Sequence, residues 1–174
     1  MSSFPFYASI PGAPIGKGRA RAAVVGGHAR LYTPKGTAEW ERATAFILRS
    51  LWRKPPYDGP VEVRLLAVGP RPKRLMRKKD SVDLIWKPTK PDNDNIEKCT
   101  YDAIVMAGLI RDDCLIVKND TQNCFTEIGG IPRIEIMIRP INCEPESFLP
   151  DDWQNGVNND CKDNDDTEYG VDCF

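Results

Sequence analysis

KPTKPDNDNIEKCTYDA, residues Lys87 to Ala103, is the stretch that decides the predicted fold. From Asp92 to about Ala107, apolar residues recur at helical spacing and Gly108 follows as a helix-ending residue. Because a proline disfavours a helical conformation in the residue before it, Pro91 places the helix start at or just after Asp92. The pattern therefore predicts a helix with two carboxylates, Asp92 and Asp94, close together at its first turn.

Polar residues line the side of this helix that is largely opposite its apolar face. At about 100° per residue, Asp94, Lys98 and Asp102 fall within an arc of roughly 80°. A purely structural explanation is open for them: Asp92 or Asn93 caps the helix, Asp94 complements the helix dipole, and Lys98 pairs with Asp94 or Asp102.

The acidic residues nevertheless outnumber what a helix cap requires. Asp92, Asn93, Asp94 and Asn95 are consecutive, and Asp112-Asp113 follow after the helix. Clustered oxygen ligands suit Mg²⁺, and a third carboxylate would complete such a site if the helix folds back on a strand. Lys98, one turn after Asp94, is then placed to reach a scissile phosphate or the attacking water, so phosphodiester hydrolysis is the chemistry indicated.

Basic residues gather in two segments upstream. Gly16-Lys17-Gly18-Arg19-Ala20-Arg21 alternates small residues with cations, and a second group comprises Arg71, Lys73, Arg74, Arg77, Lys78 and Lys79. Glycines let the backbone approach a ligand closely, and such cation density suits DNA phosphates, although a solvated loop is the plain alternative for each. We expect these residues, with Lys87, Lys90 and Arg111, to hold phosphates that flank the cleavage site.

The remaining elements predict one α+β domain, a small mixed sheet packed with two main helices. We expect strands at residues 4–10, 61–68 and 132–139 and extended segments at 115–117 and around 125, since apolar residues there alternate or lie between turn signals. Residues 34–52 predict the other helix, with Thr33 as its cap and Pro34 as its first residue.

Charge divides the chain near Pro140. Residues 141–174 hold ten of the 25 acidic and one of the 24 basic residues, so residues 1–140 carry 23 basic against 15 acidic residues. We therefore assign residues 1–140 to one basic, polyanion-binding domain and 141–174 to an acidic, disordered tail. The sequence has no apolar run long enough for a membrane span, no signal-peptide pattern and no zinc-type cysteine spacing, so we expect a cytoplasmic protein with free thiols.

The sequence resembles the RusA family of Holliday-junction endonucleases found in phages and prophages. The resemblance covers roughly residues 5 to 140 and rests on Asp92, Asp94, Asn95, Ile96, Lys98, Asp102, Ala103, Gly108, Asp112 and Asp113, together with the segments 16–21 and 31–35. One departure is Ala20, where the family more usually has proline.

The resemblance implies a homodimer that cuts paired strands of a four-way junction symmetrically. It further implies that Asp92, Asp94 and Asp113 bind Mg²⁺, with Mn²⁺ as a substitute, and that Lys98 is required for cleavage. We expect Asp102, Asp112 and Asn95 to support these residues, and the DNA contacts to include Lys17, Arg19, Arg21, Arg71, Lys73, Arg74 and Lys90.

Two other functions are open. A general metal-dependent DNase would also need clustered carboxylates and a lysine, but the restriction-enzyme motif places Glu-x-Lys or Asp-x-Lys after a strand, whereas Glu97 and Lys98 are adjacent on a predicted helix. A non-catalytic DNA-binding module would use the basic loops alone, and it would leave the acidic cluster without a purpose because carboxylates repel phosphates unless a metal intervenes.

Overall fold

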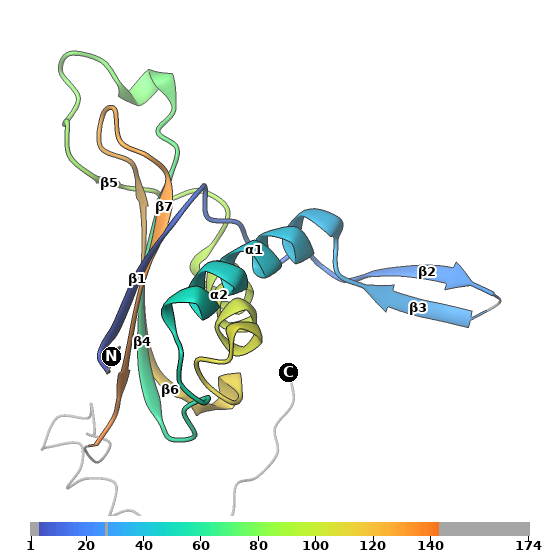
Figure 1. The fold of residues 1–174 in the computed structure, drawn as a ribbon. Coiled ribbons are helices and arrows are strands. Elements are labelled where there is room, and N and C mark those ends of the chain that lie inside the picture. Colours follow the sequence, from blue (N-terminus) through green and yellow to red (C-terminus); the bar gives the residue numbers. More distant parts are fainter. Residues whose placement is uncertain (1–3, 27, 143–174) are drawn as a thin grey trace, which may run out of the picture. The chain divides into compact units, whose positions relative to one another are not determined.

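Residues 4–26 and 28–142 are described by the structure, a computed structural model. Its strands are β1 (Phe6–Pro11), β2 (Arg21–Val25), β3 (His28–Tyr32), β4 (Val61–Gly69), β5 (Ile85–Trp86), β6 (Ile116–Phe125) and β7 (Arg133–Pro140). Its helices are α1 (Lys35–Leu51) and α2 (Asn93–Ala107), with the 3₁₀ turns η1 (Lys73–Leu75) and η2 (Asp113–Leu115). Figure 1 shows how these elements are arranged.

The main sheet has five strands in the order β1-β7-β4-β6-β5. β4 pairs in parallel with β6, whereas the other neighbours pair antiparallel, so the sheet is mixed. In β7 the buried residues Ile134, Ile136 and Ile138 alternate with less buried ones, as expected for a strand with one face in the core. The predicted α+β fold is confirmed.

Both helices lie on the same face of this sheet (Figure 1). α1 and α2 pack against each other, and the core between them and the sheet includes Leu48 of α1, Ile104 of α2 and Val63 of β4, each fully buried. Gly108 ends α2 in the left-handed conformation at φ 75°, where glycine is favoured. The predicted α2 and its glycine stop are thus confirmed.

Three details differ from the sequence-based expectations. Pro34, not Thr33, occupies the cap position of α1, and its helix begins at Lys35. The extended segments expected at 115–117 and around 125 correspond to one strand, β6, which begins at Ile116 because Leu115 still belongs to η2. The middle of β6 is mostly exposed and therefore lacks an apolar period. Residues after Arg21 form the hairpin of β2 and β3, which pair only with each other and were not predicted.

The expectations about membrane spans, cysteines and the acidic tail concern residues that the structure describes only in part. Within the described ranges, no helix has the length and apolar character needed to cross a bilayer. Cys99, Cys114 and Cys124 are free thiols. The predicted acidic tail falls almost entirely on residues 143–174, which lie outside the described residues, so its disorder and the domain boundary stay predictions.

We predict that Leu48→Ala lowers the free energy of unfolding by about 2–5 kcal/mol, because it leaves a cavity beside the sheet. The control is Phe46→Ala on the same helix, whose side chain is 77% exposed and should matter by no more than about 0.5 kcal/mol. Urea unfolding of both variants measures the difference. Equal losses would contradict the placement of the core.

Candidate active site

Asp92 stands at the N-cap position of α2, but its side chain makes no capping hydrogen bond. The carboxylate is exposed, and its own backbone N–H followed by the Asn95 amide lowers the pKa of Asp92. Asp92 is therefore ionised at neutral pH and its oxygens remain accessible from solvent. The expected role of Asn95 as a supporting residue stays a prediction.

Asp94 and Lys98 form the ion pair that the helical spacing predicts. Lys98 Nζ lies 3.1 Å from Asp94 Oδ2, and both side chains are more than half exposed. An exposed pair at this spacing stabilises a helix by only about 0.2–0.5 kcal/mol. Lys98 can therefore leave Asp94 for another anion at small cost.

The start of α2 is fixed to β6 by two asparagines: Asn93, which the sequence offered as a possible helix cap, and Asn123, which the sequence analysis did not name. Asn93 Nδ2 donates to Thr121 O, and Asn123 Nδ2 donates to Pro91 O, each at 2.8 Å. Lys87 completes this anchorage, since its Nζ donates to the carbonyls of Thr89 and Lys90 at 2.7 Å and burial lowers its pKa. The partners of the two asparagines are 28 and 32 residues away in the sequence, so only the fold reveals their role.

Two open hollows meet at Asp92. One is lined on its other side by the glycine-rich segment 14–17, and the second by residues 87–90 with Asn123. Lys90 borders both hollows and its side chain is exposed. An anion in either hollow would therefore lie between a cation and the Asp92 carboxylate.

Lys17, expected to contact DNA, is instead held by two carboxylates. Its Nζ donates to Glu41 Oε1 at 2.6 Å and also to Asp102, and its backbone N–H donates to Asn95 O at 2.8 Å. Burial alone would lower the pKa of Lys17, but Asp102 and Glu41 outweigh it and raise the pKa. Lys17 thus ties its loop to both helices, and Asp102 pairs with Lys17 rather than with Lys98.

The glycines beside Lys17 pack closely against two proline side chains. A Cβ on Gly16 would lie 2.8 Å from Pro91 Cβ, and one on Gly18 would lie 2.8 Å from Pro34 Cγ. Either side chain would push the loop away from a helix start. This segment therefore sets where the start of α2 lies.

Arg71 was also expected to contact DNA, and the structure places it in the interior instead. Its side chain is buried, with the residue only 5% exposed, and the guanidinium donates to the backbone carbonyls of Thr126, Ser81 and Asp83. A guanidinium used in this way does not face solvent. The charge of a residue is visible in the sequence, but its burial is not.

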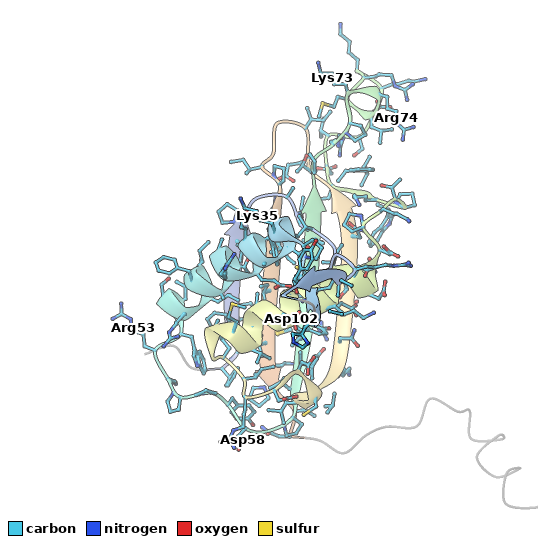
Figure 2. The ribbon with its side chains drawn as sticks, turned by 90° about the vertical axis from the view of Figure 1, so that its right-hand side faces the viewer. Lys35, Arg53, Asp58, Lys73, Arg74 and Asp102 are labelled. Atoms are coloured by element: carbon cyan, nitrogen blue, oxygen red, sulfur yellow. The ribbon has the colours of Figure 1, made fainter. Side chains whose placement is uncertain are left out.

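Other expected DNA-binding cations remain on the surface. Arg19, Lys73, Arg74 and Lys90 have exposed side chains, and Arg21 lies at the start of β2. Figure 2 shows Lys73 and Arg74 together on the loop that follows β4. The side chains of Arg19, Lys73, Arg74 and Lys90 are therefore accessible to a polyanion.

Asp113 does not join Asp92 and Asp94 within this chain. It lies in η2, directly before β6, and Asp112 accepts a hydrogen bond from Cys114 N at 2.9 Å, which lowers the pKa of Asp112. Asn93 lies beside Thr121, five residues into β6, which is roughly 16 Å along the strand from Ile116. Among the described residues, no three His, Cys, Asp or Glu side chains are grouped closely enough to hold a metal ion.

Comparison with known proteins places this chain in a family. The family model of endodeoxyribonuclease RusA matches residues 11–139, which include both helices, η2, the strands β2 to β6 at full length and all of β7 but its last residue. A search of curated proteins finds no match. The match covers most of the chain and contains Asp92, Asp94, Lys98 and Asp113. The chain therefore belongs to the RusA family of endodeoxyribonucleases, which are Holliday-junction resolvases.

Proposed function

We propose that this protein is a Mg²⁺-dependent, structure-selective endonuclease that resolves Holliday junctions and related branched DNA by paired phosphodiester hydrolysis. The observation that carries the proposal is the start of α2, where the uncapped Asp92 carboxylate stands beside Asp94, with Lys90 and Lys98 exposed next to them. A cytoplasmic location in a bacterial or phage-infected cell fits this substrate.

Asp92 and Asp94 are the proposed metal ligands that one chain brings together. Mg²⁺ prefers oxygen ligands and is commonly held by one or two carboxylates, water and substrate phosphate, so two exposed aspartates fit it. Mn²⁺ would substitute because it accepts the same ligands. When bound, the metal would supply charge stabilisation at the scissile phosphate and lower the pKa of a water molecule. Asn95 orients Asp92 for this task.

Lys98 is the proposed catalytic cation. Its ion pair with Asp94 is exposed and weak, so a scissile phosphate beside Asp94 can take its place. Once on the phosphate, the ammonium group donates hydrogen bonds to oxygens on which negative charge develops. Asp102 has no part in this step, since it bonds to Lys17.

Affinity for DNA comes from the other candidate cations. Arg19, Arg21, Lys73, Arg74 and Lys90 would contact phosphates on either side of the cleaved bond, and such contacts bind without sequence choice. Lys17 and Arg71 act inside the protein, where they hold two of the loops that carry these cations.

A homodimer would supply the third ligand. Asp113 lies at the far end of α2 from Asp94 in the same chain, so we propose that Asp113 reaches the Asp92–Asp94 pair of a second copy. A two-fold dimer forms both sites together, because each chain gives Asp113 to its partner and receives one in return. Two sites related in this way match the two strands cut in a four-way junction.

We predict that the protein cuts a synthetic four-way junction in Mg²⁺ and is inactive in EDTA. Asp94→Asn should lower the cleavage rate on the order of 100-fold or more, because it removes a ligand of the ion that stabilises the transition state. The matched control is Glu39→Gln, an exposed carboxylate on α1 whose loss should leave the rate unchanged.

The substrate comparison separates the alternatives. Equal cutting of the junction and of a linear duplex would favour a general DNase. Junction binding without cutting under every metal condition would favour a DNA-binding module.

We predict that mixing two inactive variants, Asp94→Asn and Asp113→Asn, restores nicking of the junction. In a mixed dimer one site has both substitutions, whereas the other has neither and is intact. The control mixture combines Asp92→Asn with Asp94→Asn and should stay inactive, since every site then lacks a ligand on α2. Subunit exchange is verified by two affinity tags.

If exchanged Asp94→Asn and Asp113→Asn subunits remain inactive, Asp113 does not act across the dimer. If Asp113→Asn alone retains full activity, Asp113 is not a ligand and Asp112→Asn becomes the variant to test.

A further inference from the structure

The loop of residues 72–80 carries most of the exposed positive charge that follows β4. Its cations are Lys73, Arg74, Arg77, Lys78 and Lys79. Arg77 is paired with Asp80, which accepts from both its backbone N–H and its guanidinium at 2.8–3.0 Å. The other four make no salt bridge within the described part of the chain. The 72–80 loop thus presents a dense positive surface, of which only Arg77 is paired within the loop.

Such a segment resists folding into one conformation, because like charges this close repel one another. It is nevertheless closed at its base by backbone hydrogen bonds. Thr126 N donates to Gly69 O and Ile128 N donates to Val82 O, both at 2.9 Å. The two ends of the loop are therefore held by the segment that leaves β6.

Arg71 is the side chain that joins these three segments. Its Nε donates to Thr126 O at 2.6 Å, its Nη1 to Ser81 O at 2.5 Å, and its Nη2 to Asp83 O. A guanidinium fork has donors on three nitrogens in one plane, so it can satisfy three separate carbonyls, whereas a lysine has one nitrogen. The position requires arginine for its shape as well as for its charge.

The Arg71 guanidinium makes no direct bond to a carboxylate within the described residues: its hydrogen bonds go to carbonyl oxygens, and the charges of Asp80 and Glu127 act on it only from farther away. Burying a cation in this way is unfavourable compared with a well-packed apolar residue. Stability alone therefore does not explain the residue. What its hydrogen bonds achieve is to fix the entry and exit of the 72–80 loop.

The 72–80 loop also lies at the end of the sheet where the candidate ligands lie. β4 and β6 are parallel, so Gly69 and Phe125 end at the same edge. Asn123 and Thr121, close to that edge, hold the start of α2 with Asp92. DNA at Asp92 and Asp94 could therefore extend towards the loop, where Figure 2 shows Lys73 and Arg74.

We propose that Arg71 is a positioning residue that pre-orders the 72–80 loop as a phosphate-binding surface for a DNA arm next to the cleavage site. This rests on the proposed function. The loop cations contact the phosphates, and Arg71 acts only through the loop. Pre-ordering matters because a loop fixed before binding loses less conformational entropy when DNA arrives.

The test compares Arg71→Lys, which keeps the charge, with the double variant Lys73→Gln/Arg74→Gln and with the control Arg53→Lys, an exposed arginine elsewhere (Figure 2). Junction affinity is measured against salt concentration in Ca²⁺, to suppress cleavage. The double variant should weaken binding about tenfold and flatten the log–log salt slope by roughly 1 to 2.

Arg71→Lys should weaken binding by a similar factor although net charge is unchanged, and should add little to the double variant. Without DNA, trypsin should cut Arg71→Lys faster than wild type after Lys78 or Lys79. The single-turnover cleavage rate at saturating protein should stay within about twofold of wild type, since a positioning residue for binding does not touch the reacting atoms.

Unchanged trypsin cleavage in Arg71→Lys would overturn the positioning role. Faster trypsin cleavage with unchanged junction affinity would overturn the loop as a DNA surface, and so would an unchanged salt slope in the double variant, which decides the matter if Arg71→Lys fails to fold. A wild-type protein that binds the junction and lacks nuclease activity would refute the proposed function alone.

Discussion

The parallel pairing of β4 with β6 is the constraint on which the site depends. Parallel strands cannot be joined by a tight turn, so the chain must leave the end of β4, cross the sheet and return to the start of β6. The 72–80 loop, the 87–92 segment and α2 all lie in this connection. It places the start of α2 near the end of β6 and leaves Asp113 near the beginning of that strand. The parallel pairing of β4 and β6 thus keeps Asp113 apart from Asp92 and Asp94 within one chain.

Positive charge in this protein is divided between structure and surface. Arg71 is buried and bonds to carbonyls, whereas Lys17 is only partly buried and bonds to carboxylates, and each holds a loop that also carries exposed cations. Rigid presentation matters for phosphate contacts, because the ordering of long, charged loops would otherwise oppose binding. Not every basic residue of 1–140 is therefore free to contact DNA. Lys17 and Arg71 instead hold the loops that carry other cations.

Local patterns predicted the parts of the fold that local physics determines. Helix α2 with Gly108 and the alternating strand β7 follow from periodicity, and the Asp94–Lys98 pair follows from helical spacing. The prediction found only the ends of β6, because the exposed middle of this strand has no apolar period. The roles of Lys17 and Arg71 could not be read from sequence, since their partners Glu41 and Thr126 are 24 and 55 residues away and only folding brings them together.

The N-cap aspartate of α2, Asp92, does not make the hydrogen bond that would stabilise the helix start. An aspartate at a helix N-cap normally accepts a backbone N–H, and such a cap is typically worth about 1 kcal/mol. Here the helix start is held instead by Asn93, Asn123 and the close packing of Gly16 on Pro91, so the Asp92 carboxylate is released from that duty. A carboxylate that is ionised, exposed and not needed for capping is free to bind a cation. Because other residues hold the helix start in place, the Asp92 side chain is not needed for stability there. This is the physical reason to propose a functional role for Asp92.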